Sequence, residues 1–309
     1  MTNAWVIWDA VHALLGKIAL AIGWIFSPSW MPPRDFDFFK WLVVPGYGYG
    51  FVLISFAILE LILPHQRRPW SRATLLSGTY LLLAGKMGLY AVLITPLLRN
   101  AWVYLRLPSL HLDRTLPLPL YMVVGLVVIT FIAYWAHRLM HRVPLFWQIH
   151  KIHHSATNLN WSSIYHKHFL ELLLDAPLHI IATLALGTEL VAPFGIVFIV
   201  IDVLGHSNVK VDLGRLSYII STPQAHRIHH SIEPKHYDTN FGNTFMIWDH
   251  IFGTFCYDRD HPPTGYGVRE EIPLSFVKQQ ILPLVWMQKT AQAGLARLLR
   301  GRLQNARAH

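Results

Sequence analysis

Histidines in this sequence gather into three short clusters, and these residues are the strongest candidates for chemistry. The clusters are His137 with His141, His150 with His153 and His154, and His226 with His229 and His230. Residues three and four positions apart share one face of a helix, so each cluster would present its imidazole rings together. Imidazole binds iron, copper, zinc and nickel. Eight rings are too many for one four-coordinate ion, so the pattern predicts two metal ions in one site.

The composition indicates a membrane protein. The 309 residues are 53% hydrophobic and 14% charged, with a mean hydropathy of +0.35, whereas soluble domains carry about a quarter charged residues. The net charge is +9, but Lys and Arg are scattered around apolar segments, which favours anionic lipid headgroups over nucleic acid as partner. Cys256 is the single cysteine, which excludes an internal disulfide and an all-cysteine iron–sulfur cluster, so electrons would have to come from another protein.

Long apolar segments predict the elements that position the histidines. Residues 41–63, 75–98 and 118–136 each have the roughly 20 apolar residues that a membrane-spanning helix needs. Residues 170–205 are expected to form a helical hairpin that turns between Gly187 and Pro193. Residues 1–26 lack the basic start of a signal peptide and are expected to remain as a span or an interfacial helix. The predicted fold is an all-α, integral-membrane bundle of about four to six embedded helices.

The charges around the histidines predict the orientation of this bundle. Eight Lys and Arg residues between positions 138 and 235 lie in or beside the histidine-bearing stretches, which favours the cytoplasmic side for that face. The segments that end at His137 and His206 would then emerge on one face, where all three clusters can converge. The expected protein is multi-pass, in a bacterial inner membrane, with a histidine-rich di-metal cap on the cytoplasmic side.

The chain is expected to be one membrane domain, residues 1–309, with three regions. Residues 1–115 would form N-terminal membrane helices, residues 116–260 a catalytic region, and residues 261–309 an amphipathic basic tail. From Ile272 onward, apolar residues alternate with basic ones that include Arg297 and Arg300. This pattern predicts an interfacial helix that is broken near Pro283.

The order and spacing of the clusters resemble the fatty acid hydroxylase and sterol desaturase superfamily of integral-membrane, histidine-rich di-iron oxygenases. The resemblance runs from about Tyr134 to Phe255. Four further segments carry it: residues 205–208 (GHSN), 222–226 (TPQAH), 238–243 (DTNFGN) and 248–254 (WDHIFGT). The first 115 residues resemble no family beyond membrane helices.

The resemblance implies a metal centre made of ten histidines. They are His137, His141, His150, His153, His154, His168, His206, His226, His229 and His230. His166 is the second choice for the position given to His168, and His250 is left outside the site. Ligating imidazoles usually donate their second N–H to a carboxylate or a carbonyl, so Glu171, Asp175, Asp202 and Asp238 are candidates for orienting the rings.

The resemblance also implies an oxidoreductase that holds two iron ions and uses dioxygen. It would hydroxylate an unactivated C–H bond of a fatty acyl, sterol or related isoprenoid lipid, with electrons from a ferredoxin- or cytochrome-type donor and its reductase. Desaturation and ether-lipid monooxygenation are the alternatives within the superfamily. From the residues alone, zinc remains an alternative to iron, and a membrane metal transporter remains an alternative function. The sequence shows no phosphate-binding loop, dinucleotide fingerprint, His-Glu-x-x-His motif or serine nucleophile elbow.

Overall fold

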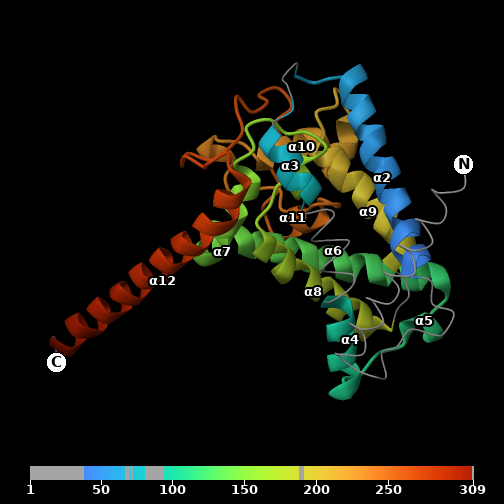
Figure 1. Ribbon diagram of the computed structural model, residues 1–309, viewed down its shortest axis with the longest axis horizontal. Coiled ribbons are helices and arrows are strands. Elements are labelled where there is room, and N and C mark those ends of the chain that lie inside the picture. The colour runs from blue at the N-terminus through green and yellow to red at the C-terminus, as the bar shows by residue number, and fades with distance from the viewer. Residues whose placement is uncertain (1–37, 67–69, 71, 81–93, 188–190, 308–309) are drawn as a thin grey trace, which may run out of the picture.

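The described part of the chain is helical, as the sequence predicts. The computed structural model describes residues 38–66, 70, 72–80, 94–187 and 191–307, which contain helices and three isolated β-bridges but no strand (Figure 1). The helices are α2 (Phe38–Ile62), α3 (Arg72–Tyr80), α4 (Thr95–Tyr104), α5 (Leu112–Thr115), α6 (Leu118–Arg142), α7 (Pro144–His154), α8 (Phe169–Leu186), α9 (Val191–His206), α10 (Pro223–His229), α11 (Ile247–Ile251) and α12 (Phe276–Arg307).

Pro144 fixes the junction between α6 and α7, the helices that carry the first two histidine clusters. Val143 caps both α6 and α7 in an extended conformation, with φ −89° and ψ 114°, because the residue before a proline avoids the helical region. Pro144 then begins α7 at a position where its missing N–H costs nothing. As a result, only Val143 separates the helix that carries His137 and His141 from the helix that carries the second cluster.

The predicted hairpin over residues 170–205 is present as two helices, α8 and α9. Gly187 ends α8 with φ +85°, and a Cβ atom there would lie 2.6 Å from the Cα of His111. Only glycine fits this left-handed position beside another backbone. The two helices then pack on different partners: α8 contacts α6 and α4, while α9 contacts α2 and α10.

Two helices have the length and surface expected of membrane spans. α6 and α8 are the described helices that are long and apolar enough to cross a bilayer, and only 22% and 19% of the residues in their most apolar windows are buried. The core helix of a soluble protein would be mostly buried, so this exposed apolar surface fits a lipid environment. Residues 1–26 and the middle of the expected span 75–98 lie outside the described residues, and the number of four to six embedded helices stays a prediction.

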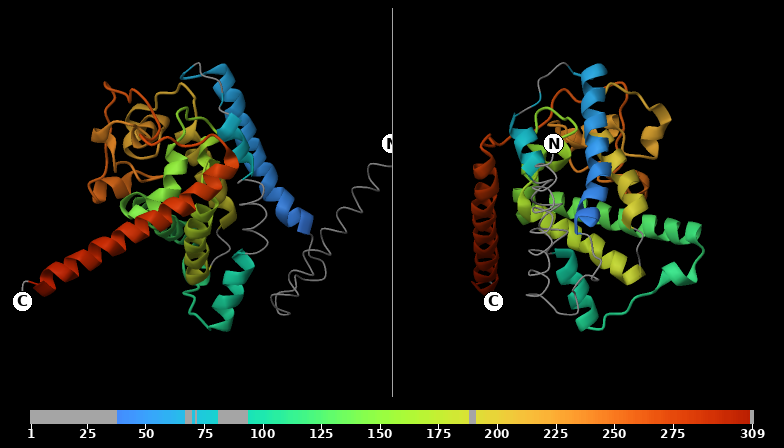
Figure 2. Two further views of the ribbon diagram at one scale, coloured as in Figure 1. Left: turned by 60° about the vertical axis from the view of Figure 1, so that its left-hand side comes forward. Right: turned by 45° about the vertical axis from the view of Figure 1, so that its right-hand side comes forward.

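The C-terminal helix corrects one expectation. α12 runs without a break through Pro283, where the sequence suggested an interruption. Pro283 is buried in the part of α12 that packs against α7, and this packing offsets the hydrogen bond that the proline ring removes. Beyond this contact α12 extends away from the body, as Figure 2 shows from two further directions.

A buried glutamate, Glu60, connects α2 to segments that adjoin the histidine-bearing helices. The Glu60 carboxylate accepts main-chain hydrogen bonds from Trp161 (2.6 Å) and Asn208 (3.0 Å), and a third bond from the Trp70 indole (3.0 Å). Asn208 follows His206 by two residues. Glu60 therefore holds the end of α9 in place, together with an apolar cluster that Val52 and Phe56 form with Val203.

Replacing Glu60 by alanine should destabilise the protein, because three donors would lose their acceptor. Each buried donor without a partner costs about 1–3 kcal/mol, so the temperature of unfolding in detergent should fall clearly. Glu60→Gln keeps one carbonyl oxygen for the main-chain donors and should fall less. Equal thermal unfolding of Glu60→Ala and the unchanged protein would show that this anchor does not matter.

Candidate metal centre

Nine of the ten predicted histidines come together in the structure, in two groups. The first group consists of His137, His141, His150, His154 and His229, and the second of His153, His206, His226 and His230. Each residue offers one ring nitrogen, and within each group these nitrogens lie within 4.8 Å of one another. Two sets of nitrogen atoms at this spacing could each hold a metal ion.

The two groups adjoin each other. The ring centroids of His154 and His230, which belong to different groups, are 4.3 Å apart and nearly parallel. His154 also lies 4.7 Å from His229 in its own group, and His229 lies 5.3 Å from His230. The histidines at positions 150, 153 and 154 and those at positions 226, 229 and 230 therefore alternate between the two groups.

Local sequence explains how α10 presents its rings. Thr222 caps the helix, and its side chain accepts a hydrogen bond from the Ala225 main chain, while Pro223 occupies the first turn. The cap starts the helix at Pro223, three residues before His226. The rings at 226, 229 and 230 then lie on one side of the helix. The predicted lead-in segment 222–226 thus acts as a helix start.

Main-chain carbonyls fix the direction of three rings. In each case a ring Nδ1–H donates to a carbonyl oxygen, which can only accept, so the neutral ring keeps its lone pair on Nε2. The pairs are His137 with Phe241 (2.8 Å), His229 with Thr239 (2.7 Å) and His206 with Asp202 (2.8 Å). The outer nitrogen of each ring is anchored, and the inner nitrogen is available to a metal.

Carboxylates lie beside two more rings. Nδ1 of His150 lies 3.1 Å from a carboxylate oxygen of Glu171, whose other oxygen lies 3.0 Å from the Lys167 ammonium. Nδ1 of His141 lies 3.9 Å from Asp238, which is an ion-pair distance and too long for a hydrogen bond. Glu171 therefore has the closer geometry for orienting a ring.

The unpaired nitrogens test whether these residues fit metal ions. In the first group, Nε2 of His141, His150, His154 and His229 is buried without a hydrogen-bond partner. In the second group, Nε2 of His206 lies 3.2 Å from that of His153 and 2.9 Å from that of His226. Nitrogens about 2.1 Å from one tetrahedral ion lie about 3.4 Å apart. The donor set fits two ions.

Burial keeps the rings in the form that binds metal. Burial lowers the pKa of His229 to about 3, against the opposing effect of its hydrogen bond to Thr239. Burial, followed by the neighbouring histidines, also places the pKa of His154 and His230 well below the usual value. The rings are therefore neutral at neutral pH, with lone pairs that a cation can use.

His168 does not join either group, which corrects the tenth predicted ligand. It caps α8, where Nδ1 accepts a hydrogen bond from the Leu170 main chain (3.2 Å) and Nε2 donates to the Gln280 carbonyl (2.9 Å). Both nitrogens are therefore used by the protein. His166 also lies outside the groups, with Nε2 3.2 Å from the Ser155 hydroxyl.

Two of the four carboxylates predicted to orient the rings, those of Glu171 and Asp238, lie near a grouped histidine. Glu171 is beside His150 and Asp238 is near His141, as the sequence suggested. Asp202 acts differently, because its main-chain carbonyl rather than its carboxylate accepts the hydrogen bond from His206. The Asp175 side chain lies outside the described part of the structure.

The loop at residues 238–243 contains orienting groups that sequence reasoning missed. Asp238 and Asn240 adopt left-handed conformations, with φ of 59° and 55°, which Asp and Asn tolerate better than most residues. The Asn240 amide donates to the Ala225 and Cys256 carbonyls, at 2.9 Å and 2.6 Å. These bonds hold the alternate carbonyls of Thr239 and Phe241 against the rings. The Asp/Asn-rich composition was the available signal, but it gave no role.

Buried Asp249 supports the same loop. Its carboxylate accepts hydrogen bonds from the main chains of Phe241 and Gly242, both at 2.8 Å, and from the Thr254 hydroxyl at 2.7 Å. Its neighbour His250 is exposed and lies 3.0 Å from the Tyr218 carbonyl, outside both histidine groups. This agrees with leaving His250 out of the site.

Aromatic rings border the first group. The Phe241 ring is fully buried, with its centroid 5.1 Å from His141 and 5.9 Å from His229. The Trp147 ring lies 5.3 Å from His141 and 5.5 Å from His154. These apolar faces limit the access of water to the histidine nitrogens.

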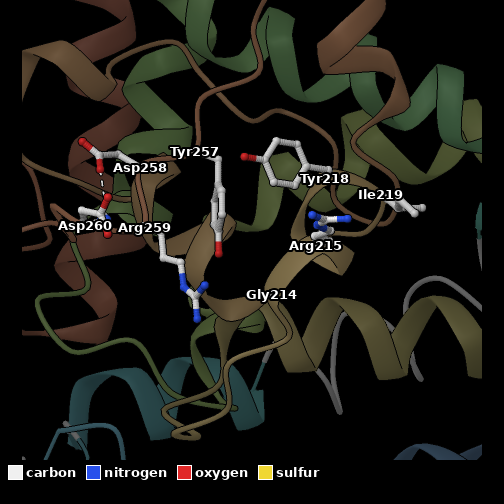
Figure 3. Close-up of a pocket in the computed structure, with 8 residues that line it drawn as sticks. All are labelled: Gly214, Arg215, Tyr218, Ile219, Tyr257, Asp258, Arg259 and Asp260. Carbon is white, nitrogen blue, oxygen red and sulfur yellow. Dashed lines mark hydrogen bonds between the residues drawn. The ribbon is translucent and has the colours of Figure 1, made fainter.

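An open pocket of about 630 Å³ lies apart from the histidines (Figure 3). It is lined by Gly214, Arg215, Tyr218, Ile219, Tyr257, Asp258, Arg259 and Asp260. None of the nine grouped histidines contributes to its wall, and Arg259 is already paired with Asp212. The pocket is therefore separate from the candidate metal centre.

Comparison with known proteins matches the region that contains the centre. Residues 122–254 match the family model described as fatty acid hydroxylase. The ornithine lipid hydroxylase OlsE of Rhizobium tropici is 34% identical over 169 residues, which are 54% of this chain and 51% of that protein. The alkylglycerol monooxygenase of Caenorhabditis elegans is 30% identical over 141 residues, 45% of this chain and 27% of that protein.

A third relative extends the range of names. The very-long-chain aldehyde decarbonylase GL1-6 of Oryza sativa subsp. indica is 30% identical over 141 residues, 41% of this chain and 21% of that protein. This chain thus spans about half the length of the first relative and less of the others. No solved structure gave a significant match. The region that matches the fatty acid hydroxylase family model holds all nine grouped histidines.

Proposed function

We propose that this protein is a membrane-bound di-iron oxygenase that hydroxylates an unactivated C–H bond of a lipid. The observation that carries the proposal is the pair of adjoining histidine groups, whose inner nitrogens are buried and face one another. The match of residues 122–254 to the fatty acid hydroxylase family model supports it. So do relatives named as a lipid hydroxylase and a monooxygenase.

Each histidine group is proposed to hold one iron ion. Bound iron would supply the redox chemistry that inserts one oxygen atom of dioxygen into a C–H bond, while two external electrons and two protons convert the other oxygen atom to water. Iron is favoured over zinc because hydroxylation with dioxygen needs a redox-active metal, and zinc has none of this chemistry. The nine histidines of the two groups are the proposed ligands.

The residues around the rings hold this centre in one geometry. The carbonyls of Thr239 and Phe241 fix two rings from the loop after α10. Glu171 of α8 lies 3.1 Å from the His150 ring and is itself paired with Lys167. Rings that are oriented before the metal binds lose little freedom on binding, and such partners often contribute 10–100-fold to affinity or activity, as a rough guide.

The substrate is proposed to reach the centre from the bilayer. α6 exposes Val123, Val127 and Phe131, at 55%, 47% and 39%, on the helix that ends at the histidines. A lipid chain could follow this apolar surface while its reacting carbon lies near the metal ions. The protein's own contribution is to place that carbon and to exclude water.

Two alternatives belong to the same chemistry. Several relatives are named alkylglycerol monooxygenases, so an ether lipid is a second substrate class for this site. Desaturation would need the same metals and a different placement of the lipid carbon.

A metal transporter is disfavoured because transport needs ligands along a path through the membrane, whereas here the proposed ligands form two adjoining buried groups.

The proposed location is a multi-pass membrane protein with the metal centre on the cytoplasmic side of a bacterial inner membrane. Basic residues near the histidines support this orientation, for example Arg142 at the end of α6 and Lys151 within α7. Electrons would come from a separate ferredoxin- or cytochrome-type protein, because this chain has one cysteine and no iron–sulfur motif.

His229→Ala should abolish product formation and lower the bound iron. His229 faces His137 and His154 within the first group, so its loss removes one ligand and leaves a gap. Lipidomics of expressing cells would test this, with a gain of one oxygen expected for the unchanged protein and none for the variant. His261→Ala is the matched control, because His261 is exposed and paired with Asp258. Product from His229→Ala at the control level would contradict the assignment.

Glu171→Gln should weaken the centre without removing a ligand. The amide has no negative charge to pair with Lys167, so we expect a loss of roughly 10–100-fold in iron affinity or activity. Iron content after dialysis against a chelator is the measurement. Glu270→Gln serves as the control, because Glu270 pairs with Lys151 at 3.7 Å but is half exposed. If the two variants kept iron equally well, Glu171 would not orient His150.

A further inference from the structure

The C-terminal helix has an unusual composition for a helix that leaves the body of the protein. α12 is 32 residues long. It contains six basic residues, Lys278, Lys289, Arg297, Arg300, Arg302 and Arg307, and no Asp or Glu. In Figure 1 and in both views of Figure 2, its C-terminal half stands clear of the other described helices. Tertiary packing therefore does not explain why this half is an amphipathic helix.

One face of α12 is packed against the protein. Gln279 is 2% exposed, Pro283 is buried, and Trp286 stacks under the Lys151 ammonium of α7, 4.1 Å from the ring centre. These positions are three or four residues apart and so lie on one side of the helix. The first third of α12 is thus fixed on the helix that carries three of the centre's histidines.

The opposite face is an exposed apolar stripe. Its members form two groups, within 277–285 in the packed part of the helix and within 295–299 in the part that stands clear, and both groups lie on the same side of the helix. They are Val277 (60% exposed), Ile281 (54%), Leu284 (42%), Val285 (38%), Leu295 (58%), Leu298 (68%) and Leu299 (51%). Two exposed apolar groups on one face, with Gln288, Ala291 and Gln292 between them, indicate an apolar environment beside both parts of the helix.

Three of the basic residues lie along one side of this stripe. Lys278, Lys289 and Arg300 fall on one side of it at helical spacing, and all three are exposed. An apolar stripe bordered by cations matches the boundary between the acyl chains and the headgroups of an anionic bilayer. A second copy of this chain is a poor match in charge, because the chain itself carries a net charge of +9.

We propose that α12 is a membrane-surface anchor that lies in the interface of an anionic bilayer, with its leucine stripe toward the acyl chains. The helix would also set the position of the metal centre relative to the lipid. Gln280 of α12 accepts a hydrogen bond from the Phe169 main chain (2.8 Å) and donates to the Lys167 carbonyl (3.1 Å). These two hydrogen bonds connect α12 to the start of α8, two residues before Glu171.

The test compares two labelled positions on opposite faces of the helix in the full-length protein. With Cys256→Ser as background, Leu295→Cys places a polarity-sensitive fluorophore on the stripe, and Ala293→Cys places it on the other face. The protein is reconstituted in vesicles of phosphatidylcholine alone or mixed with phosphatidylglycerol, and quenching by brominated lipid is measured. We expect strong quenching at 295, weak quenching at 293, and a larger difference when phosphatidylglycerol is present.

Charge reduction provides the second arm. Arg297→Gln with Arg300→Gln in the Leu295→Cys protein should shift the ratio of docked to undocked helix by about 30-fold toward water in the phosphatidylglycerol vesicles. Retained iron content in every variant shows that the body is folded. The proposal is overturned if the 295 label is quenched only by aqueous iodide. It is equally overturned if both positions respond alike, or if the 295 label responds to protein concentration or to an added acidic redox protein instead of lipid.

Discussion

The burial of many neutral imidazoles in one place is the constraint on which the rest of the structure depends. Buried polar nitrogens without partners are costly, and this protein gathers such nitrogens from His141, His150, His154 and His229. Hydrogen bonds within the protein leave these four nitrogens unsatisfied, although the other ring nitrogen of His229 donates to the Thr239 carbonyl. Metal ions would repay this cost. The proposed centre would therefore couple folding to metal binding.

The fold supplies the ligands from helix ends. α6 and α7 meet at Pro144, α9 ends at His206, and α10 begins at its Thr222 cap, so four helix termini converge on one volume. Loop 238–243 then closes over the rings with its carbonyls, and Asp249 and Asn240 hold this loop. The proposed metal centre would thus lie where the apolar helices α6 and α9 end, so that a lipid chain and the metal ions could share one site.

Sequence reasoning could find nine histidines that the structure brings together, because metal chemistry demands particular residue types at helical spacing. The three clusters were sufficient to predict a shared two-ion site, and Pro144 marks the boundary between two of them. The partners that orient the rings were harder to predict, because main-chain carbonyls such as those of Thr239 and Phe241 have no signature in residue type. His168 shows the opposite error: its position beside a Leu-Glu pair resembled a ligand, but the start of α8 and the Gln280 carbonyl use both of its nitrogens.

The same limit explains Asp202 and Pro283. A carboxylate one turn before a histidine suggests an orienting acid, yet the helix itself offers the nearer carbonyl; a proline suggests a break, yet packing on α7 keeps α12 continuous. The most direct test of the central claim is X-ray absorption spectroscopy, with metal analysis, on the purified protein. The account predicts two irons per chain surrounded mainly by imidazole nitrogen. A single ion, zinc in place of iron, or a ligand set dominated by carboxylate oxygen would contradict it.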